Sequence, residues 1–93
     1  MSVSIERIGS IEKIGEYRRF QLAVNGKLCV PVWMCEPEWQ QYADQGEERL
    51  FDRLAFVSVM QTQNETPLSG HEREILAGAV NELAQRRNAH AGA

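Results

Sequence analysis

Residues 28–34 constrain this chain most, because they are apolar at almost every position. Side chains of a strand point alternately to its two faces, so a strand of this composition has two apolar faces to cover. One face would carry Leu28, Val30, Val32 and Met34, and the other Cys29, Pro31, Trp33 and Cys35. A chain of 93 residues has little material with which to cover both. We therefore expect part of this stretch to contact a partner. Pro31 lacks a backbone N–H, so the strand should lie at a sheet edge.

The residues before this stretch predict a β-hairpin. Residues 17–24 alternate between apolar and polar side chains, and the turn dipeptide Asn25-Gly26 follows them. A two-residue loop would set Leu22 opposite Cys29, whereas a three-residue loop would bring Leu22 onto the same face as Leu28. We favour the three-residue loop, with Gly26 in a left-handed or bulge position, because it gathers the apolar side chains on one face.

A second hairpin is predicted near the N-terminus. The run Ile5-Glu6-Arg7-Ile8-Gly9 is echoed by Ile11-Glu12-Lys13-Ile14-Gly15, and Gly9-Ser10 suits a type II′ turn between them. In that register Arg7 would face Glu12, and Glu6 would face Lys13, each pair being opposite in charge. The alternative is a plain loop at Gly9-Ser10 between two strands that do not pair with each other.

From Glu36 the pattern becomes helical. Pro37 suits the first turn of a helix, and Gly46 is a candidate for its end. A second helix should begin near Glu47, because the residues that follow have the three-four spacing of a buried stripe: Leu50, Phe51, Leu54 and Val57 or Ser58. Residues 56–59 alone would also fit a strand, and we favour the helix because of the stripe before them. Residues 62–68 are mostly polar and predict a loop.

The last helix should begin at Ser69, with Glu72 as its capping-box partner. Its buried stripe consists of Ile75, Leu76, Ala79, Val80 and Leu83. Glu82 and Arg86 form an i,i+4 pair of opposite charge. We expect residues 89–93 to fray.

These elements predict an α+β fold, in which an antiparallel three- to four-stranded meander is followed by two or three helices packed on one face. We expect a single small domain over residues 1–93, with strands mainly in 1–35 and helices mainly in 36–88. Small bacterial and phage domains share this order of elements, but the order alone carries no function.

Composition limits which cellular compartment and which class of partner we expect for this chain. The formal net charge is −3, and no basic residues concentrate in the sequence, so we expect no nucleic-acid partner. No apolar run approaches the roughly 20 residues of a membrane span, and the first residues lack the features of a signal peptide. Cys29 and Cys35 would lie about 20 Å apart on a regular strand, too far for a disulfide. We therefore expect a cytoplasmic protein with reduced cysteines and no membrane partner.

The residues carry no signature of catalysis or metal binding. His71 and His90 are the two histidines, and neither has a second histidine at the spacing of a zinc-binding helix. Cys35 precedes a predicted helix start, which favours a thiolate, but Glu36 and Glu38 oppose that effect. We expect no catalytic residue, no metal ligand and no cofactor.

The candidate binding residues are aromatic. Trp33, Trp39 and Tyr42 fall within ten residues, and Trp and Tyr are enriched at interface hot spots. Together with Glu36, Glu38 and Asp44 they would form a contact surface with an acidic rim. The competing interpretation places both tryptophans in the core, between sheet and helix.

This pattern favours a non-catalytic protein-binding module, acting as a small regulator or inhibitor of another protein or as a self-associating dimer. One alternative is a small-molecule or thiol-based activity at Cys35. Another is an acidic mimic of nucleic acid, which would need one set of carboxylates on a single face: Glu36, Glu38, Asp44, Glu47, Glu48 and Asp52.

Overall fold

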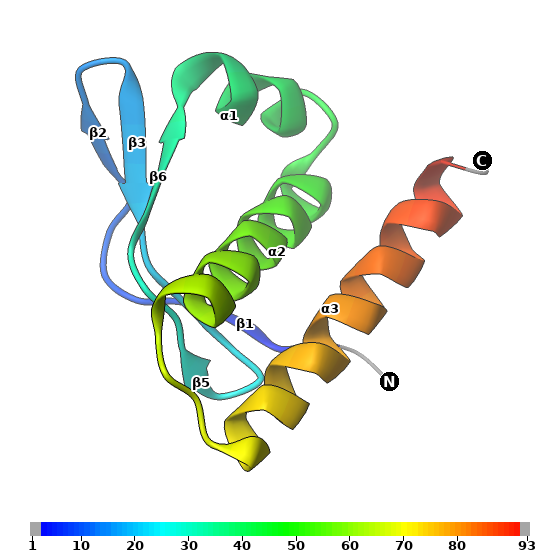
Figure 1. The fold of residues 1–93 in the computed structure, drawn as a ribbon. Coiled ribbons are helices and arrows are strands. Elements are labelled where there is room, and N and C mark those ends of the chain that lie inside the picture. The colour runs from blue at the N-terminus through cyan, green and yellow to red at the C-terminus, as the bar shows by residue number, and fades with distance from the viewer. Residues whose placement is uncertain (1–2, 92–93) are drawn as a thin grey trace.

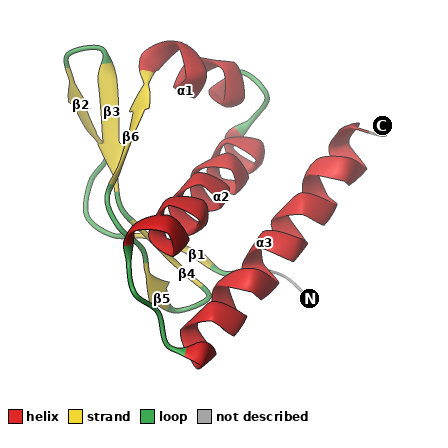
Figure 2. Cartoon of the chain, in the orientation of Figure 1, coloured by secondary structure: helices red, strands yellow, loops and turns green. Residues whose placement is uncertain are grey.

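A computed structural model describes residues 3–91, and within them six short strands precede three helices (Figure 1). The strands are β1 (Ile5–Arg7), β2 (Glu12–Ile14), β3 (Tyr17–Phe20), β4 (Leu22–Val24), β5 (Lys27–Leu28) and β6 (Val32–Cys35). The helices are α1 (Glu36–Ala43), α2 (Glu47–Glu65) and α3 (Gly70–Ala91). This order confirms the predicted α+β class, with a strand meander first and the helices after it (Figure 2).

The six strands form a three-stranded antiparallel meander that is bent at its middle. The strand order is β1-β4-β5 in one half and β2-β3-β6 in the other, and every pairing is antiparallel. A single residue, Gln21, separates β3 from β4, so the central strand runs through both halves. As predicted, the strand that holds Pro31 lies at an edge, because both β5 and β6 have one neighbour each.

A bulge at the bend corrects the predicted face of one residue. Phe20 faces Val32, and the Cys29 N–H donates to the Leu22 carbonyl, so one residue on the central strand opposes two on its neighbour. The extra residue shifts the alternation of side chains along the edge strand. Val32 is therefore buried as predicted, but Cys29 is buried in place of Leu28, which is exposed.

The turns also differ from the prediction. Val24 faces Lys27, so Asn25 (φ 50°) and Gly26 (φ 81°) form a two-residue loop rather than the three-residue loop we favoured. Two successive positive φ angles are what a type I′ turn requires, and this turn fits the twist of a hairpin. The bulge further along, and not a longer loop, brings the apolar side chains onto one face.

The predicted hairpin at Gly9-Ser10 is wrong, because β1 pairs with β4 and β2 pairs with β3. The tight turn lies instead at Gly15-Glu16, where Ile14 faces Tyr17 and Gly15 has a φ of 61°. Glycine reaches this left-handed region without steric cost, so the turn chemistry of Gly15 and Gly9 is equally suitable. Pairing with the long central strand decides between them. The two echoed runs lie end to end along that strand.

The helices follow the predicted order with shifted ends. α2 is continuous through residues 56–59, which excludes the strand alternative, and it runs on to Glu65 where we expected a loop from residue 62. α1 ends at Ala43, before the candidate end at Gly46. The Gly46 N–H still donates to the Ala43 carbonyl at 3.1 Å, and Gly46 is the residue before α2. α3 continues to Ala91, past the expected end at residue 88, and residues 92–93 lie outside the described part.

The start of α3 confirms the capping box. The Ser69 hydroxyl accepts from the Glu72 N–H at 3.2 Å, and a Glu72 carboxylate oxygen accepts from the Ser69 N–H at 3.0 Å. From this start α3 runs along α2, and the predicted stripe residues Leu76, Ala79 and Leu83 are buried.

The core lies between one face of the sheet and the helices. α1 contacts β3 and β6, α2 contacts β4 and β6, and α3 packs on α2 and β5. The largest fully buried side chains include Phe20, Leu22 and Leu54, from both layers. Thr62 ties the layers together, because its hydroxyl accepts from the Val30 N–H at the bulge and donates to the Ser58 carbonyl. Thr62, which we expected in a loop, is thus buried in α2, because its hydroxyl binds the backbone at the bulge.

Candidate functional site

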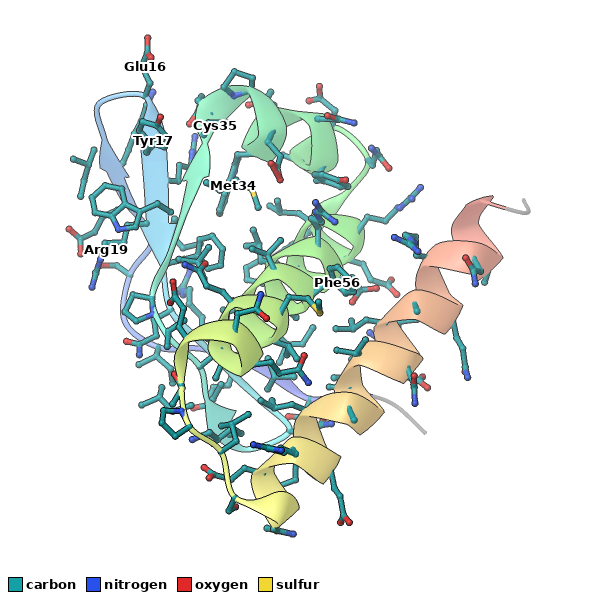
Figure 3. The ribbon with its side chains drawn as sticks, in the orientation of Figure 1. Glu16, Tyr17, Arg19, Met34, Cys35 and Phe56 are labelled. Carbon is teal, nitrogen blue, oxygen red and sulfur yellow. The ribbon has the colours of Figure 1, made fainter. Side chains whose placement is uncertain are left out.

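The other face of the sheet is not covered by these helices. Residues along β3 and β6 alternate: Arg18 and Met34 share the helix-facing side, whereas Arg19 and Trp33 face each other on the outer side. In Figure 3 the side chain of Met34 points toward the helices and that of Arg19 points away from them. Met34 is 3% exposed and Trp33 is 53% exposed, so the alternation separates core from surface within one strand.

Three large apolar side chains gather on this outer face, one from each strand of the β2-β3-β6 half. They are Ile14, Tyr17 and Trp33, and we call them the outer patch; their exposed fractions are 43%, 49% and 53%. Ile14 lies directly opposite Tyr17. The Tyr17 and Trp33 rings meet edge to face, with centroids 6.5 Å apart and planes at 73°. This geometry is one that aromatic pairs prefer, so the two rings support each other while staying accessible.

Charges around the outer patch are balanced. Arg19 forms an exposed ion pair with Glu12 on the neighbouring strand, at 3.5 Å. Lys13 lies opposite Arg18, so the register places it on the helix-facing side, and Glu16 lies in the turn before Tyr17. The charged pair on the outer side of these strands, Arg19 with Glu12, is therefore neutral.

A shallow hollow of about 510 Å³ continues the outer face beyond Tyr17. It lies between the Gly15-Glu16 turn and the first turn of α1, and Cys35 and Pro37 line it. Cys35 is half-buried and is the residue immediately before α1. The first turn of α3, which holds His71, lies at the opposite end of the molecule from the start of α1 in Figure 1, so His71 is not placed to serve Cys35 as a base.

Trp39 belongs to the core. It is 5% exposed, its ring centroid lies 5.9 Å from that of Phe20, and the Arg18 guanidinium stacks over it at 5.0 Å. Arg18 also donates two hydrogen bonds to Glu36, at 2.8 and 2.9 Å, and this pair lowers the pKa of Glu36 and raises that of Arg18. The competing interpretation of the sequence thus holds for Trp39 and fails for Trp33.

Tyr42 lies on the helical side of the molecule. It is half-buried on α1 and faces the Arg53 guanidinium of α2, 5.3 Å from its ring centroid. The three aromatic residues that the sequence grouped together are therefore distributed over the outer face, the core and the helical side. Of the acidic residues proposed as a rim, Glu36 lines the hollow beside Tyr17 and pairs with Arg18. Glu38 lies 3.7 Å from Arg53, and Asp44 accepts a hydrogen bond from Gln40.

Sequence reasoning missed Ile14 and Tyr17. The available signal was the dipeptide Gly15-Glu16 between two residues of high strand propensity, which matches a two-residue hairpin as well as Gly9-Ser10 does. Choosing it would have paired Ile14 with Tyr17 and placed both on the face that carries Trp33.

The acidic residues do not form one uninterrupted anionic face. Glu36 pairs with Arg18, Glu38 with Arg53 at 3.7 Å, and Asp52 with Arg86 at 2.9 Å. This arrangement counts against a nucleic-acid mimic, which would present unpaired carboxylates.

The other candidates for chemistry have structural surroundings. Cys29 is buried, and burial raises the pKa of its thiol, which makes it a poor nucleophile. In residues 3–91, no group of three or more His, Cys, Asp or Glu side chains could hold a metal ion. The His90 side chain lies outside the described part of the chain.

Comparison with protein-family models, curated proteins and solved structures finds no match to this chain. No helix in the described residues is long and apolar enough to cross a membrane. The assignment of function therefore depends on the surfaces described above.

Proposed function

We propose that this chain is a non-catalytic protein-binding module that associates with a second copy of itself through the outer patch. The observation that supports this most strongly is the uncovered sheet face, on which Ile14, Tyr17 and Trp33 gather from three strands. Removing apolar surface from water contributes roughly 25 cal/mol per Å², so such a face gains from being covered. Trp and Tyr are also the residue types that most often dominate binding energy.

The balanced charge of the outer face favours a second copy as the occupant. A strongly acidic or strongly basic partner would require a surface on which charges of the opposite sign dominate. Here Arg19, opposite Trp33, is paired with Glu12. In a twofold dimer the same surface meets itself, and a charge-balanced surface does so without net repulsion. Sheets that stack face to face lie about 10 Å apart, which leaves room for the two aromatic pairs to interdigitate.

Sedimentation equilibrium over a wide concentration range tests this proposal. We expect the wild-type chain to show a monomer–dimer equilibrium. Trp33→Ser should raise the dimer dissociation constant by about 30-fold or more, which corresponds to the ~2 kcal/mol of a hot spot. Ile14→Ser should raise it by a smaller factor, since it removes less apolar surface.

Met60→Ser is the matched control. Met60 is 38% exposed, close to the 43% of Ile14, but it lies on α2 rather than on the sheet. Its substitution should leave the dissociation constant unchanged. A wild-type chain that stays monomeric at all concentrations would overturn self-association, and would leave a regulator or inhibitor of another protein as the remaining use of the patch. Equal weakening by Met60→Ser and Ile14→Ser would show that the contact lies elsewhere.

We also propose a cytoplasmic location, supported by the two free cysteines, which are typical of reducing compartments. Alkylation of the protein in intact cells, followed by mass measurement, should find both thiols unpaired. A mixed disulfide on either thiol would contradict it.

A further inference from the structure

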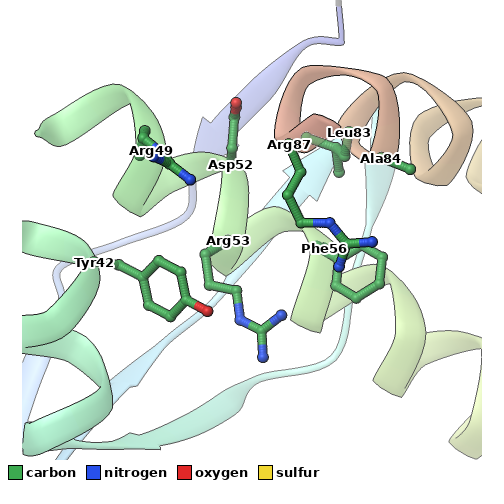
Figure 4. Close-up of a pocket in the computed structure, with 8 residues that line it drawn as sticks. All are labelled: Tyr42, Arg49, Asp52, Arg53, Phe56, Leu83, Ala84 and Arg87. Carbon is green, nitrogen blue, oxygen red and sulfur yellow. The ribbon is translucent and has the colours of Figure 1, made fainter. Parts of the chain in front are cut away.

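A pocket on the helical side of the molecule gathers three arginines. It has a volume of about 90 Å³ and lies where α1, α2 and α3 meet (Figure 4). Arg49 and Arg53 enter it from successive turns of α2, and Arg87 enters from α3. Residues four apart on a helix share a face, so α2 presents both of its guanidinium groups to the same space.

Two aromatic rings hold the central arginine. The Arg53 guanidinium carbon lies 5.3 Å from the centroid of Tyr42 and 5.7 Å from that of Phe56. Figure 4 shows the Arg53 guanidinium between these two rings, with the Arg87 guanidinium beside Phe56. Stacking on rings fixes the guanidinium plane, so the donor groups of Arg53 are already oriented before any ligand arrives.

The positive charges exceed the negative ones that line the pocket. Asp52 is the one carboxylate of the lining, and its Oδ1 already accepts a hydrogen bond from Arg86 at 2.9 Å. Arg53 reaches Glu38 only at 3.7 Å. Within residues 3–91, no carboxylate lies within 4.0 Å of the Arg49 or Arg87 nitrogens. The lining therefore carries three positive charges against one negative charge.

Two buried polar atoms at the pocket have no hydrogen-bond partner, and one is a donor whereas the other is an acceptor. The Nε–H of Arg53 has no acceptor, whereas the Oδ2 of Asp52 has no donor. Buried polar groups in folded proteins are almost always satisfied by protein, water or a bound ion. A hydrated oxyanion could satisfy both, accepting from the arginine and bringing a water to the carboxylate.

We propose that this pocket binds a small oxyanion of the phosphate class. Arginine presents its donors in a planar fork that matches two oxygens of a phosphate group, and three arginines line this pocket. The volume suits a group of this size and is well below the roughly 300 Å³ at which pockets for drug-sized ligands begin. The phosphate is either the free ion or the terminal group of a phosphate ester, whose organic part would extend along Tyr42 and Phe56.

The pocket and the outer patch are separate. The pocket lies among the three helices, and the outer patch lies on the face of the sheet that the helices do not contact. The phosphate proposal therefore stands or fails independently of self-association.

Isothermal titration calorimetry with inorganic phosphate, and in parallel with phenyl phosphate, tests the proposal at constant ionic strength. We expect saturable binding of at least one of them, which Arg49→Gln and Arg87→Gln each weaken by about tenfold or more. Neither arginine has an ion pair to lose, so both variants should keep the wild-type melting temperature. Tighter binding of phenyl phosphate identifies an ester as the ligand, and tighter binding of the ion identifies free phosphate.

Arg73→Gln is the matched control, because Arg73 is an exposed arginine of α3 that does not line the pocket. Its substitution should leave binding unchanged. The proposal is overturned if neither phosphate binds at concentrations up to about 10 mM, a range that covers dissociation constants in the low millimolar range. It is also overturned if Arg73→Gln weakens binding as much as Arg87→Gln, since the effect would then be one of general charge.

Discussion

A tryptophan lies on each side of this sheet, and one of the two is exposed whereas the other is buried. Trp33 and Trp39 stand six positions apart, yet Trp33 is 53% exposed and Trp39 is 5% exposed. Trp39 lies on a helix that packs against β3 and β6, whereas Trp33 lies on the side of β6 that no helix contacts. The difference teaches that the placement of the helices, rather than local apolar character, decides which side chains are left for a partner.

The largest expected effect sharpens this contrast. Trp39→Ala should lower the free energy of unfolding by about 3–5 kcal/mol, because it leaves a cavity beside Phe20 and removes the ring under Arg18. Trp33→Ala should change it by less than about 1 kcal/mol, as substitutions at exposed positions usually do. Urea unfolding at concentrations where the chain is monomeric measures both. Equal losses would show that the two faces are equally buried in solution.

A smaller effect tests the contact that joins the inner face to α2 at the bend of the sheet. Thr62→Val keeps the shape of the side chain but removes the acceptor for the Val30 N–H, 3.0 Å away. We expect a loss of about 1–3 kcal/mol of stability, the cost of leaving a buried donor unsatisfied. Thr66→Val, just after the same helix, is the control and should cost less. If the two substitutions cost the same, the bulge does not depend on Thr62.

The smallest expected effect is on the stability that Glu72 contributes where α3 meets the sheet. Glu72 forms an ion pair with Lys27 at 2.6 Å and accepts from the Ser69 N–H, and these contacts lower its pKa from 4.5 to about 2. A carboxylate whose pKa is lower in the folded state stabilises the fold above its unfolded pKa, and this contribution disappears as the pH falls from 4.5 toward 2. Unfolding free energies measured across this range should therefore decline.

Glu72→Gln isolates the charge, because glutamine can still complete the capping box. At neutral pH the variant should be less stable than the wild type, and the gap should close as the pH approaches 2. Glu74→Gln, at an exposed position of the same helix, should show no such gap. A gap that persists at low pH would mean that the carboxylate charge is not the stabilising feature.

The sequence allowed most of the fold to be predicted. The strand pattern over residues 17–24, the stripe in residues 50–58 and the capping box at Ser69 are local patterns, and each lies in an element of the expected type. The alternation itself is lost in β4, where Ala23 is buried between Leu22 and Val24. Local patterns could not decide between Gly9-Ser10 and Gly15-Glu16, since both suit a turn and only pairing with the central strand separates them. The bulge at residues 30–31 was equally hidden, because it is a property of two strands together.

The candidate surface was predictable only in part. Trp33 was predicted as a contact residue from the excess of apolar residues in its strand; it is exposed, and its role in binding stays a prediction. Trp39 and Tyr42 were grouped with it because they are near in sequence, but the turn into α1 carries both to other sides of the molecule. Ile14 and Tyr17 join Trp33 through strand pairing, which the mistaken hairpin concealed.

The most direct test of the account is the fluorescence of Trp33 as a function of protein concentration. The variant Trp39→Phe keeps an aromatic ring beside Phe20 and leaves Trp33 as the one tryptophan. In dilute solution its emission should be at long wavelength and readily quenched by acrylamide. It should shift to shorter wavelength, and become protected, over the concentrations at which sedimentation shows dimers. Emission that stays at long wavelength while dimers form would contradict the outer patch as the interface.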